Sequence, residues 1–416
     1  MPARPDPPRL LVVDGHRKRA FYANLVFAVD AEWSSVAPPE LLAGVSPTTD
    51  LVIVDDESWP WVGASLPDLR RRGVPSLHLI DGILEWRNTW EHPGTESEAD
   101  GMPRFQPVLA DKIACIGRSQ ARLLESWGNV GKCEVTGSPR FDNVRRAPRQ
   151  RPAGEPYRIL VTTARTPGFS SADIARVRES LIDLRRWFER HRATDGARVQ
   201  PVWRVTGELT ASVDPDESSD GWSRCLTEQL ETVDALITTP STVQIEGMLA
   251  GVPVALIDYL NRPHFVPAAW TVTAPGQIDE TVPMLLAPDA RRMLYQDTIL
   301  HDAVECRSPA TPRVASLIEA MVAAGREARR EGRTVRLPDR IVVDDANGHH
   351  RPEERYDPAV IHPSHPVLAE RSLAELQAEV GHLRRAIRLS PSQMAYRIVC
   401  GWERYVRDRL HPWSRR

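Results

Sequence analysis

Short apolar runs bounded by polar or turn-forming residues are the feature of this sequence that most constrains its fold. Such runs are typical of strands buried on both faces of a parallel sheet. Segments with helical spacing separate them, which predicts parallel strands joined by crossover helices and therefore an α/β protein. We expect strands at residues 9–13, 51–54, 76–80, 113–116, 132–136, 157–162, 199–205, 235–238 and 254–257, and helices at 17–29, 67–72, 119–127, 172–191, 225–232, 243–250, 290–300 and 313–329.

A proline- and arginine-rich stretch, APRQRPAGEPYR at 147–158, interrupts this alternation, which then restarts. With 416 residues the chain is long enough for more than one core. Because open parallel sheets bind ligands beyond the carboxyl ends of their strands, we expect two Rossmann-like domains that face a cleft. The expected divisions are an N-terminal domain at 1–146, a linker at 147–158, a C-terminal domain at 159–331, a polar irregular linker at 332–370 and a C-terminal helical extension at 371–416.

Composition argues against several classes of protein. The net charge of -3 gives no general reason to expect nucleic-acid binding. The five cysteines include no C-x-x-C pair, so neither a zinc site nor a disulfide framework is indicated. The first apolar run is too short for a signal peptide, and no stretch approaches the ~20 apolar residues of a membrane span. We therefore expect a soluble, cytoplasmic protein.

The segment from 384 to 416 mixes apolar residues with many arginines. A basic amphipathic helix can lie on an anionic membrane, which would make the protein peripheral on the inner face of that membrane. A helix that packs across the two domains is the alternative, and the sequence leaves both open.

The stretch DALITTPSTVQIEGMLAGVPVALID at 234–258 places a helix between two apolar strands. Thr239, Ser241 and Thr242 precede or begin the helix, whose N-terminus is a ready anion site. Glu246 follows Thr242 by four residues, about 6 Å along the axis at roughly 1.5 Å per residue. That spacing suits a diphosphate at the helix start and a ribose held by the carboxylate. An ordinary β-α-β unit with a solvent-facing glutamate is the alternative.

The same stretch, together with VTGSPRFD at 135–142, resembles segments of glycosyltransferases of the GT-B fold. The resemblance is greatest to those of bacterial surface and capsule polysaccharide synthesis and to the CDP-glycerol glycerophosphotransferases. It implies that Ser241 and Thr242 contact the donor diphosphate and that Glu246 holds the ribose. It also implies a transferase with a nucleotide-sugar co-substrate, no other cofactor, and a glycan or glycolipid acceptor.

Three departures from the superfamily narrow this expectation. Thr238 stands where one large retaining group carries a second glutamate, which favours an inverting mechanism. The Ser-Gly-Gly-x-x-Glu-Glu pattern of nonhydrolysing UDP-N-acetylglucosamine 2-epimerases is absent. The Gln-His-Gly of many capsule and glycerophosphate transferases is also absent, and the equivalent place reads Ile80-Asp81-Gly82.

Transfer to a hydroxyl needs a general base near strand ends of the N-terminal domain. DGH at 14–16 and IDGILEW at 80–86 supply His16, Asp81 and Glu85, each of which could instead be a turn or cap residue. The run LEWRNTWEH at 84–92 has the composition of an acceptor-binding loop, with Trp86, Arg87 and Asn88 as contacts. Its two tryptophans could equally pack the loop onto the core.

Positive charge for the leaving diphosphate is expected from Arg165 and Arg204, which lie at or near the ends of strands in the second domain. His264, after the last predicted strand, is a weaker candidate for the nucleotide pocket. No Asp-x-Asp motif follows a strand, so transfer without a metal is expected. Two alternatives to glycosyl transfer remain: a transferase of polyol phosphate from a CDP-linked donor, and a non-catalytic module that binds glycans or a partner.

Overall fold

The computed structural model describes residues 6–13, 23–38, 41, 45–55, 60–91, 104–191, 199–213 and 225–342. Three predictions lie outside these residues: His16, the C-terminal helical extension at 371–416, and the polar linker beyond residue 342. The chain divides into two compact units. Unit 1 holds the described residues up to Gly82, then Asn88–Asp142, and those from Glu305 onward, whereas unit 2 holds Ile83–Arg87 and Asn143–Val304.

In unit 1 six described strands form one parallel sheet in the order β2-β1-β3-β4-β5-β6. Apart from the edge strand β2 and the first residue of β1, the strands are buried, as expected where helices cover both faces of a parallel sheet. The strands are β1 (Arg9–Val13), β2 (Glu32–Val36), β3 (Leu51–Val54), β4 (Ser76–Leu79), β5 (Lys112–Cys115) and β6 (Cys133–Val135). The helices are α3 (Pro60–Arg71), α4 (Arg118–Ser126) and α11 (Ala310–Arg330), with short turns η2 (Arg87–Glu91) and η3 (Pro139–Phe141).

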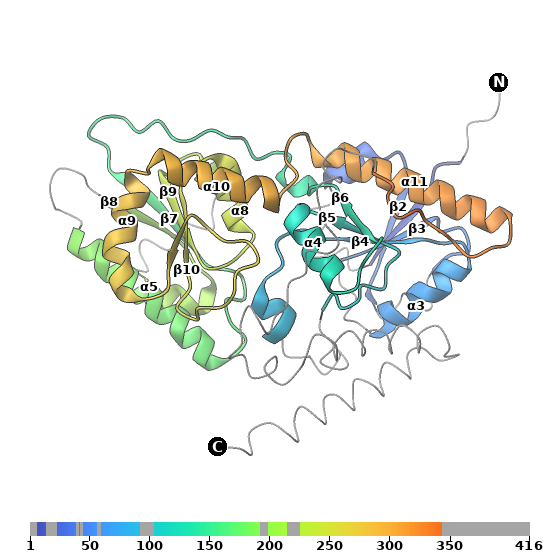
Figure 1. Ribbon diagram of the computed structural model, residues 1–416, viewed down its shortest axis with the longest axis horizontal. Helices are drawn as coiled ribbons and strands as arrows, with labels where there is room; N and C mark the ends of the chain where they lie inside the picture. Colours follow the sequence, from blue (N-terminus) through green and yellow to red (C-terminus); the bar gives the residue numbers. More distant parts are fainter. Residues whose placement is uncertain are drawn as a thin grey trace, which may run out of the picture. The chain divides into compact units, whose positions relative to one another are not determined.

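Helix α11 returns to unit 1 from the far end of the sequence and packs on its sheet (Figure 1). Its apolar stripe, which includes Leu317 and Met321, joins the cluster formed by Leu10, Ile53 and Leu77. The expected C-terminal domain ran to residue 331, so the observed division differs there. Helical periodicity reveals which face of a helix is apolar, but it does not reveal which sheet that face covers.

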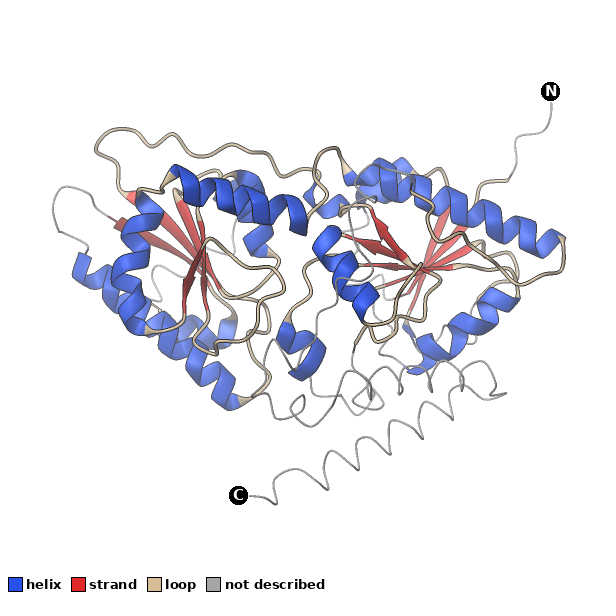
Figure 2. Cartoon of the chain, in the orientation of Figure 1, coloured by secondary structure: helices blue, strands red, loops and turns tan. Residues whose placement is uncertain are grey.

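In unit 2 five described strands form a second parallel sheet in the order β11-β10-β9-β7-β8, with helices on both faces (Figure 2). The strands are β7 (Tyr157–Thr162), β8 (Val199–Arg204), β9 (Ala235–Thr238), β10 (Val254–Ile257) and β11 (Trp270–Val272). The helices are α5 (Ser171–His191), α7 (Leu226–Leu230), α8 (Val243–Ala250), α9 (Ile278–Leu286) and α10 (Ala290–Ala303), with 3-10 turns η4 (Gly207–Ser212) and η5 (Pro275–Gln277).

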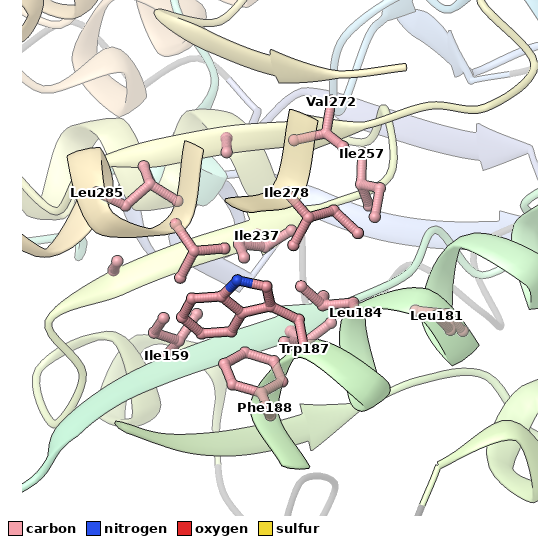
Figure 3. Close-up of a cluster of buried hydrophobic side chains, with 14 of the residues drawn as sticks. Ile159, Leu181, Leu184, Trp187, Phe188, Ile237, Ile257, Val272, Ile278 and Leu285 are labelled. Atoms are coloured by element: carbon pink, nitrogen blue, oxygen red, sulfur yellow. The ribbon is translucent and has the colours of Figure 1, made fainter. Parts of the chain in front are cut away.

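The core of unit 2 lies between α5, α9 and one face of this sheet (Figure 3). Trp187 of α5 is fully enclosed, with its ring edge-on to Phe188 at a centroid distance of 5.5 Å. Helix α8 covers the other face, where a Cβ at Gly247 would lie 2.5 Å from Cδ2 of Leu236. Only glycine therefore permits this approach, which holds α8 close against β9.

The two sheets share one topology. Counted from the first strand of each unit, the order 2-1-3-4-5 occurs in both, and unit 1 adds a sixth strand. In a doubly wound sheet of this order the crossover helices diverge between the first and third strands, and ligands bind beyond the carboxyl ends of the strands at that switch point. In unit 2 the switch point lies between β7 and β9. The expected α/β class with two Rossmann-like units is confirmed.

Candidate functional site

A row of hydroxyl groups runs across the carboxyl ends of β8, β7 and β9 in unit 2. We call it the hydroxyl row; its members are Thr206, Thr163, Thr162, Thr238 and Ser241. The backbone N–H of Thr206 donates to Oγ1 of Thr163 at 3.0 Å. Oγ1 of Thr162 donates to Oγ1 of Thr238 at 2.8 Å, and Oγ of Ser241 lies 3.2 Å from that same oxygen. Neutral hydroxyls therefore line the switch point where a ligand is expected.

The start of helix α8 adjoins this row and has no side-chain cap. Thr242 occupies the cap position, but its Oγ1 accepts a hydrogen bond from the N–H of Ile83 at 3.2 Å. Oγ1 of Thr239 instead accepts from the N–H of Ala164 at 2.7 Å. Because these hydroxyls accept from other parts of the chain, no side chain among the described residues caps the first-turn N–H groups of α8, although the N–H of Gln244 donates to the carbonyl of Ser241 at 3.1 Å. The positive end of the helix is thus available to an anion.

Two charged residues expected at this site lie at the same end of the sheet. Glu246 is in the first turn of α8 and only 8% exposed. Arg204 ends β8 and donates from Nη1 to Oε1 of Gln229 at 2.9 Å. Burial lowers the pKa of Arg204, an effect opposed by the nearby Cys225 and Glu246. Arg165, three residues beyond β7, is exposed.

The five residues Ile83–Arg87 are embedded in unit 2, although the chain on either side of them belongs to unit 1. Trp86 is 2% exposed, and its ring lies 6.0 Å from that of Phe265. Arg87 donates from Nη2 to the carbonyl of Pro240 at 3.4 Å. Two residues predicted for an acceptor loop therefore lie beside the start of α8.

The rest of the predicted acceptor loop belongs to unit 1. Asn88 is half-buried there, and the ring of Trp90 packs edge-on against Trp127 at 5.9 Å. Each tryptophan of the run is thus packed against another aromatic ring.

Glu85 is a buried carboxyl within the embedded segment and forms an ion pair with Arg87. Burial raises its pKa to about 7, and Arg87 opposes that rise. The same cavity contains a second pair, in which Nε2 of His264 lies 2.9 Å from Oδ2 of Asp258. Asp258 was not predicted, although its position directly after the apolar run of β10 was a usable signal.

A narrow cavity in unit 2 is lined by Ile83–Arg87, by the loop at the start of α8 and by residues 257–266. Its volume is about 30 Å³. Cavities that hold small ligands are roughly 300–1,000 Å³. The cavity beside the α8 start is therefore far smaller than a typical small-ligand site.

Of the two predicted bases that the structure describes, Glu85 belongs to unit 2 and Asp81 to unit 1. Asp81 follows β4 in unit 1 and is partly exposed. The carbonyl of the next residue, Gly82, accepts from Nε2 of Gln120 at 3.0 Å, which fixes this strand end.

The motif VTGSPRFD holds the start of α11 within unit 1. The carboxylate of Asp142 accepts from the N–H groups of Ala310 at 2.6 Å and Thr311 at 2.8 Å, and from Oγ1 of Thr311 at 2.6 Å. Gly137 has a φ of 75°, and a Cβ there would lie 2.5 Å from the carbonyl oxygen of Glu305. Asp142 and Gly137, two positions of the motif, thus have structural roles within unit 1.

The residues that the structure describes show neither a metal-binding cluster nor a membrane-spanning helix. No group of three or more histidines, cysteines, aspartates and glutamates there is placed to hold a metal ion. No helix in those residues is both long enough and apolar enough to cross a bilayer.

No protein-family model matches the chain, and no curated protein sequence matches it. Solved structures, in contrast, match the chain. A candidate UDP-N-acetylglucosamine 2-epimerase from Listeria monocytogenes matches with a TM-score of 0.51 at 16% identity, over 75% of this chain and 96% of that one. A variant of the wall teichoic acid polymerase TagF matches with a TM-score of 0.50 at 11% identity, over 77% and 90% of the two chains.

At these identities the similarity establishes the fold. The chain has a GT-B-type α/β fold, with two Rossmann-like units. The resemblance inferred from the two sequence motifs is confirmed at that level.

Proposed function

We propose that this protein is a glycosyltransferase that moves a sugar from a nucleotide-sugar donor to a surface polysaccharide or glycolipid acceptor. The observation that carries the proposal is the uncapped start of α8 at the switch point of unit 2, with the hydroxyl row beside it and Glu246 in its first turn. The names of the two similar structures, one for a UDP-linked sugar and one for a wall polymer, support this class of substrate.

In this proposal unit 2 binds the donor. The diphosphate lies at the N–H groups of the α8 start, where Thr239, Ser241 and Thr242 supply hydroxyls. Arg165 and Arg204 contribute positive charge to the leaving diphosphate. The carboxylate of Glu246 accepts hydrogen bonds from the ribose hydroxyls, an arrangement that its burial beside the helix start favours.

Unit 1 supplies the general base, from Asp81 or His16, to deprotonate the acceptor hydroxyl. Trp86 and Asn88 contact the acceptor. Transfer is inverting and needs no metal, since the bound diphosphate is neutralised by arginine and helix N–H groups. Such an enzyme would work in the cytoplasm or at the inner face of the membrane.

Transfer of a polyol phosphate from a CDP-linked donor is the second candidate, favoured by the structural likeness to a wall teichoic acid polymerase. The two candidates share the diphosphate site but differ in the preferred base. A clear preference for CDP over UDP would favour the second.

The test is isothermal titration of the protein with UDP, GDP, CDP and CMP, beside the variant Glu246→Ala. We expect at least one diphosphate to bind, CMP to bind more weakly, and Glu246→Ala to weaken the diphosphate by about tenfold or more, since a charge-assisted hydrogen-bond acceptor is lost. Glu280→Ala, an exposed acid on α9, is the matched control and should bind as the wild type does. Absence of diphosphate binding, or equal affinities for the two variants, contradicts the proposal.

A further inference from the structure

The embedded segment Ile83–Arg87 carries a buried ion pair to the start of α8, and this pair has a role that the proposed function does not assign. Resting on that function, we propose that Arg87 is a cation of the diphosphate site and that Glu85 is its internal counter-ion, which the incoming diphosphate displaces. Donor binding then includes the uptake of a proton by Glu85. This places Arg87 on the donor rather than the acceptor, and Glu85 in charge compensation rather than in the role of general base.

The placement of Arg87 is the first argument. Its side chain is 8% exposed, and Nη2 lies 3.4 Å from the carbonyl of Pro240, inside the loop that begins α8. Its Nε is buried and has no hydrogen-bond partner among the described residues. A guanidinium offers five donors in a planar fork that matches phosphate oxygens. Arg87 thus brings both charge and unused donor capacity to an uncapped helix start.

The charge balance around Arg87 is the second argument. In the described part of the chain Glu85 is its ion-pair partner, and this carboxyl is almost fully enclosed. Burial raises the pKa of Glu85 to about 7, so near neutral pH the carboxyl is half protonated and compensates Arg87 only in part. A buried guanidinium with a partly neutral partner is a binding site for an anion.

The other charged groups of the cavity are compensated by neighbours of their own. Oδ2 of Asp258 lies 2.9 Å from Nε2 of His264, and Arg262 pairs with Asp173 at 3.1 Å. The hydroxyl of Tyr259 donates to Asp183 at 3.3 Å. Asp258 raises the pKa of Glu85 and His264 lowers it, both by less than burial and Arg87 do. In the Glu85–Arg87 pair, by contrast, burial raises the pKa of the carboxyl to about 7, so the buried guanidinium is compensated only in part.

The sign of the pH dependence follows from the competition for Arg87. Below about pH 7 Glu85 is mostly neutral, so the charge of Arg87 is free to attract phosphate oxygens. Above it Glu85 is ionised, compensates Arg87 and repels the ligand. Affinity for a diphosphate should therefore fall as pH rises through about 7, by at most about tenfold per pH unit for one linked proton.

The experiment is titration of UDP and CDP from about pH 6 to about pH 8.5 against the wild type, Glu85→Gln, Arg87→Gln and Arg87→Lys. The terminal phosphate of the ligand itself titrates near pH 6, but this effect is common to all four proteins and cancels in their ratios. Glu85→Gln should bind about tenfold more tightly than the wild type at pH 8 and equal it near pH 6, since only the ionised form competes.

Arg87→Gln should weaken binding by about tenfold or more at pH 6.5 and remove the pH dependence attributable to Glu85. Arg87→Lys keeps the charge without the planar fork, so its affinity for the diphosphate should lie between those of the wild type and Arg87→Gln. This variant tests the inference even if Arg87→Gln does not fold. Arg190 is exposed on α5, so Arg190→Gln is the matched control. It should change neither the affinity for the diphosphate nor its pH dependence.

The experiment distinguishes a failure of this inference from a failure of the proposed function. If the wild type binds a diphosphate but both Arg87 variants bind equally well, or Glu85→Gln follows the pH profile of the wild type, the inference is overturned and the proposed function stands. If the wild type binds no diphosphate at any pH, both fall together.

Discussion

The N-termini of α8 and α11 each lie beside polar residues that follow a strand, β9 for α8 and β6 for α11, yet the two helix starts differ. The start of α11 is closed by Asp142, whose carboxylate accepts three hydrogen bonds from Ala310 and Thr311. At the start of α8 the hydroxyls of Thr239 and Thr242 accept from N–H groups elsewhere in the chain, and no described side chain accepts from the first-turn N–H groups of the helix. Polar residues near a helix start therefore mark a ligand site only where they leave the first N–H groups uncovered.

The difference arises from where each polar side chain finds its partner. The Asp142 carboxylate, in the turn that follows β6, reaches the start of α11 although Ala310 lies 168 residues further along the chain. In unit 2, by contrast, the hydroxyls of Thr239 and Thr242 are drawn away by the N–H groups of Ala164 and Ile83. Unit 1 thus uses its buried polar groups to hold its own chain, and substitutions there should change stability without changing ligand affinity.

The largest loss of stability is expected when a buried ion pair of unit 1 is broken. Nζ of Lys112 lies 2.7 Å from Oε1 of Glu134, and the two side chains are 1% and 0% exposed. The same carboxylate accepts from the N–H groups of Ile341 and Val342 at 2.9 and 3.0 Å. Glu134→Ala should lower the free energy of unfolding by about 3–5 kcal/mol, because it leaves a buried ammonium uncompensated. Urea denaturation followed by far-UV circular dichroism measures it.

The matched control for that variant is Glu32→Ala, which breaks an exposed pair with Arg9 and should cost about 1 kcal/mol or less. In both variants diphosphate affinity should stay within about twofold of the wild type wherever the protein is folded. A loss below about 1 kcal/mol for Glu134→Ala would show that the pair does not hold unit 1 together.

The next largest effect is expected at the closed helix start. Asp142→Ala should lower the free energy of unfolding by about 1–2 kcal/mol, since it removes the cap of α11. Asp142→Asn keeps one oxygen acceptor and should lose less. The same denaturation experiment measures both. If Asp142→Ala instead weakened diphosphate binding while stability was unchanged, the contrast between the two helix starts would be wrong.

Much of the fold could be predicted because buried parallel strands are continuous apolar runs. The strands β1, β3, β7, β9 and β10 have the bounds expected from sequence. Strand β2 was missed because its sequence, EWSSV, is mostly exposed at the edge of the sheet, and β11 because it has only three residues. Helix α3 begins at Pro60, whereas the sequence predicted a start at Pro67. Pro67 lies inside the helix, so this proline does not mark a helix start.

The site was less predictable, and the reasons are tertiary. Spacing placed Glu246 one turn beyond Thr242, and both lie at the start of α8 as expected. No local pattern reveals that Arg87, separated from that helix by more than 150 residues of chain, donates to Pro240. Nor could the raised pKa of Glu85 be foreseen, since it depends on burial among residues of another part of the sequence.

The smallest effect is expected at the hydroxyl of Thr242, at the start of α8. The question is whether this hydroxyl contacts the ligand or only holds Ile83 in place. Thr242→Val keeps the shape of the side chain and removes Oγ1, which accepts from the N–H of Ile83. In the proposed function the same hydroxyl donates to the diphosphate while it accepts from Ile83. A neutral hydrogen bond is worth about 0.5–1.5 kcal/mol, so diphosphate affinity should fall by roughly two- to tenfold, and the free energy of unfolding should fall by up to about 1 kcal/mol because the N–H of Ile83 loses its acceptor. Isothermal titration and urea denaturation measure the two quantities on the same samples.

Thr298→Val is the matched control, because that threonine is exposed on α10 and its hydroxyl donates within its own helix to the carbonyl of Leu294 at 2.9 Å. It should change neither quantity by more than about 0.5 kcal/mol. If Thr242→Val lowers stability by more than about 1 kcal/mol and leaves affinity unchanged, its hydroxyl serves only to hold Ile83. The start of α8 would then resemble that of α11, and the embedded segment rather than a ligand would be what its polar groups are built to hold.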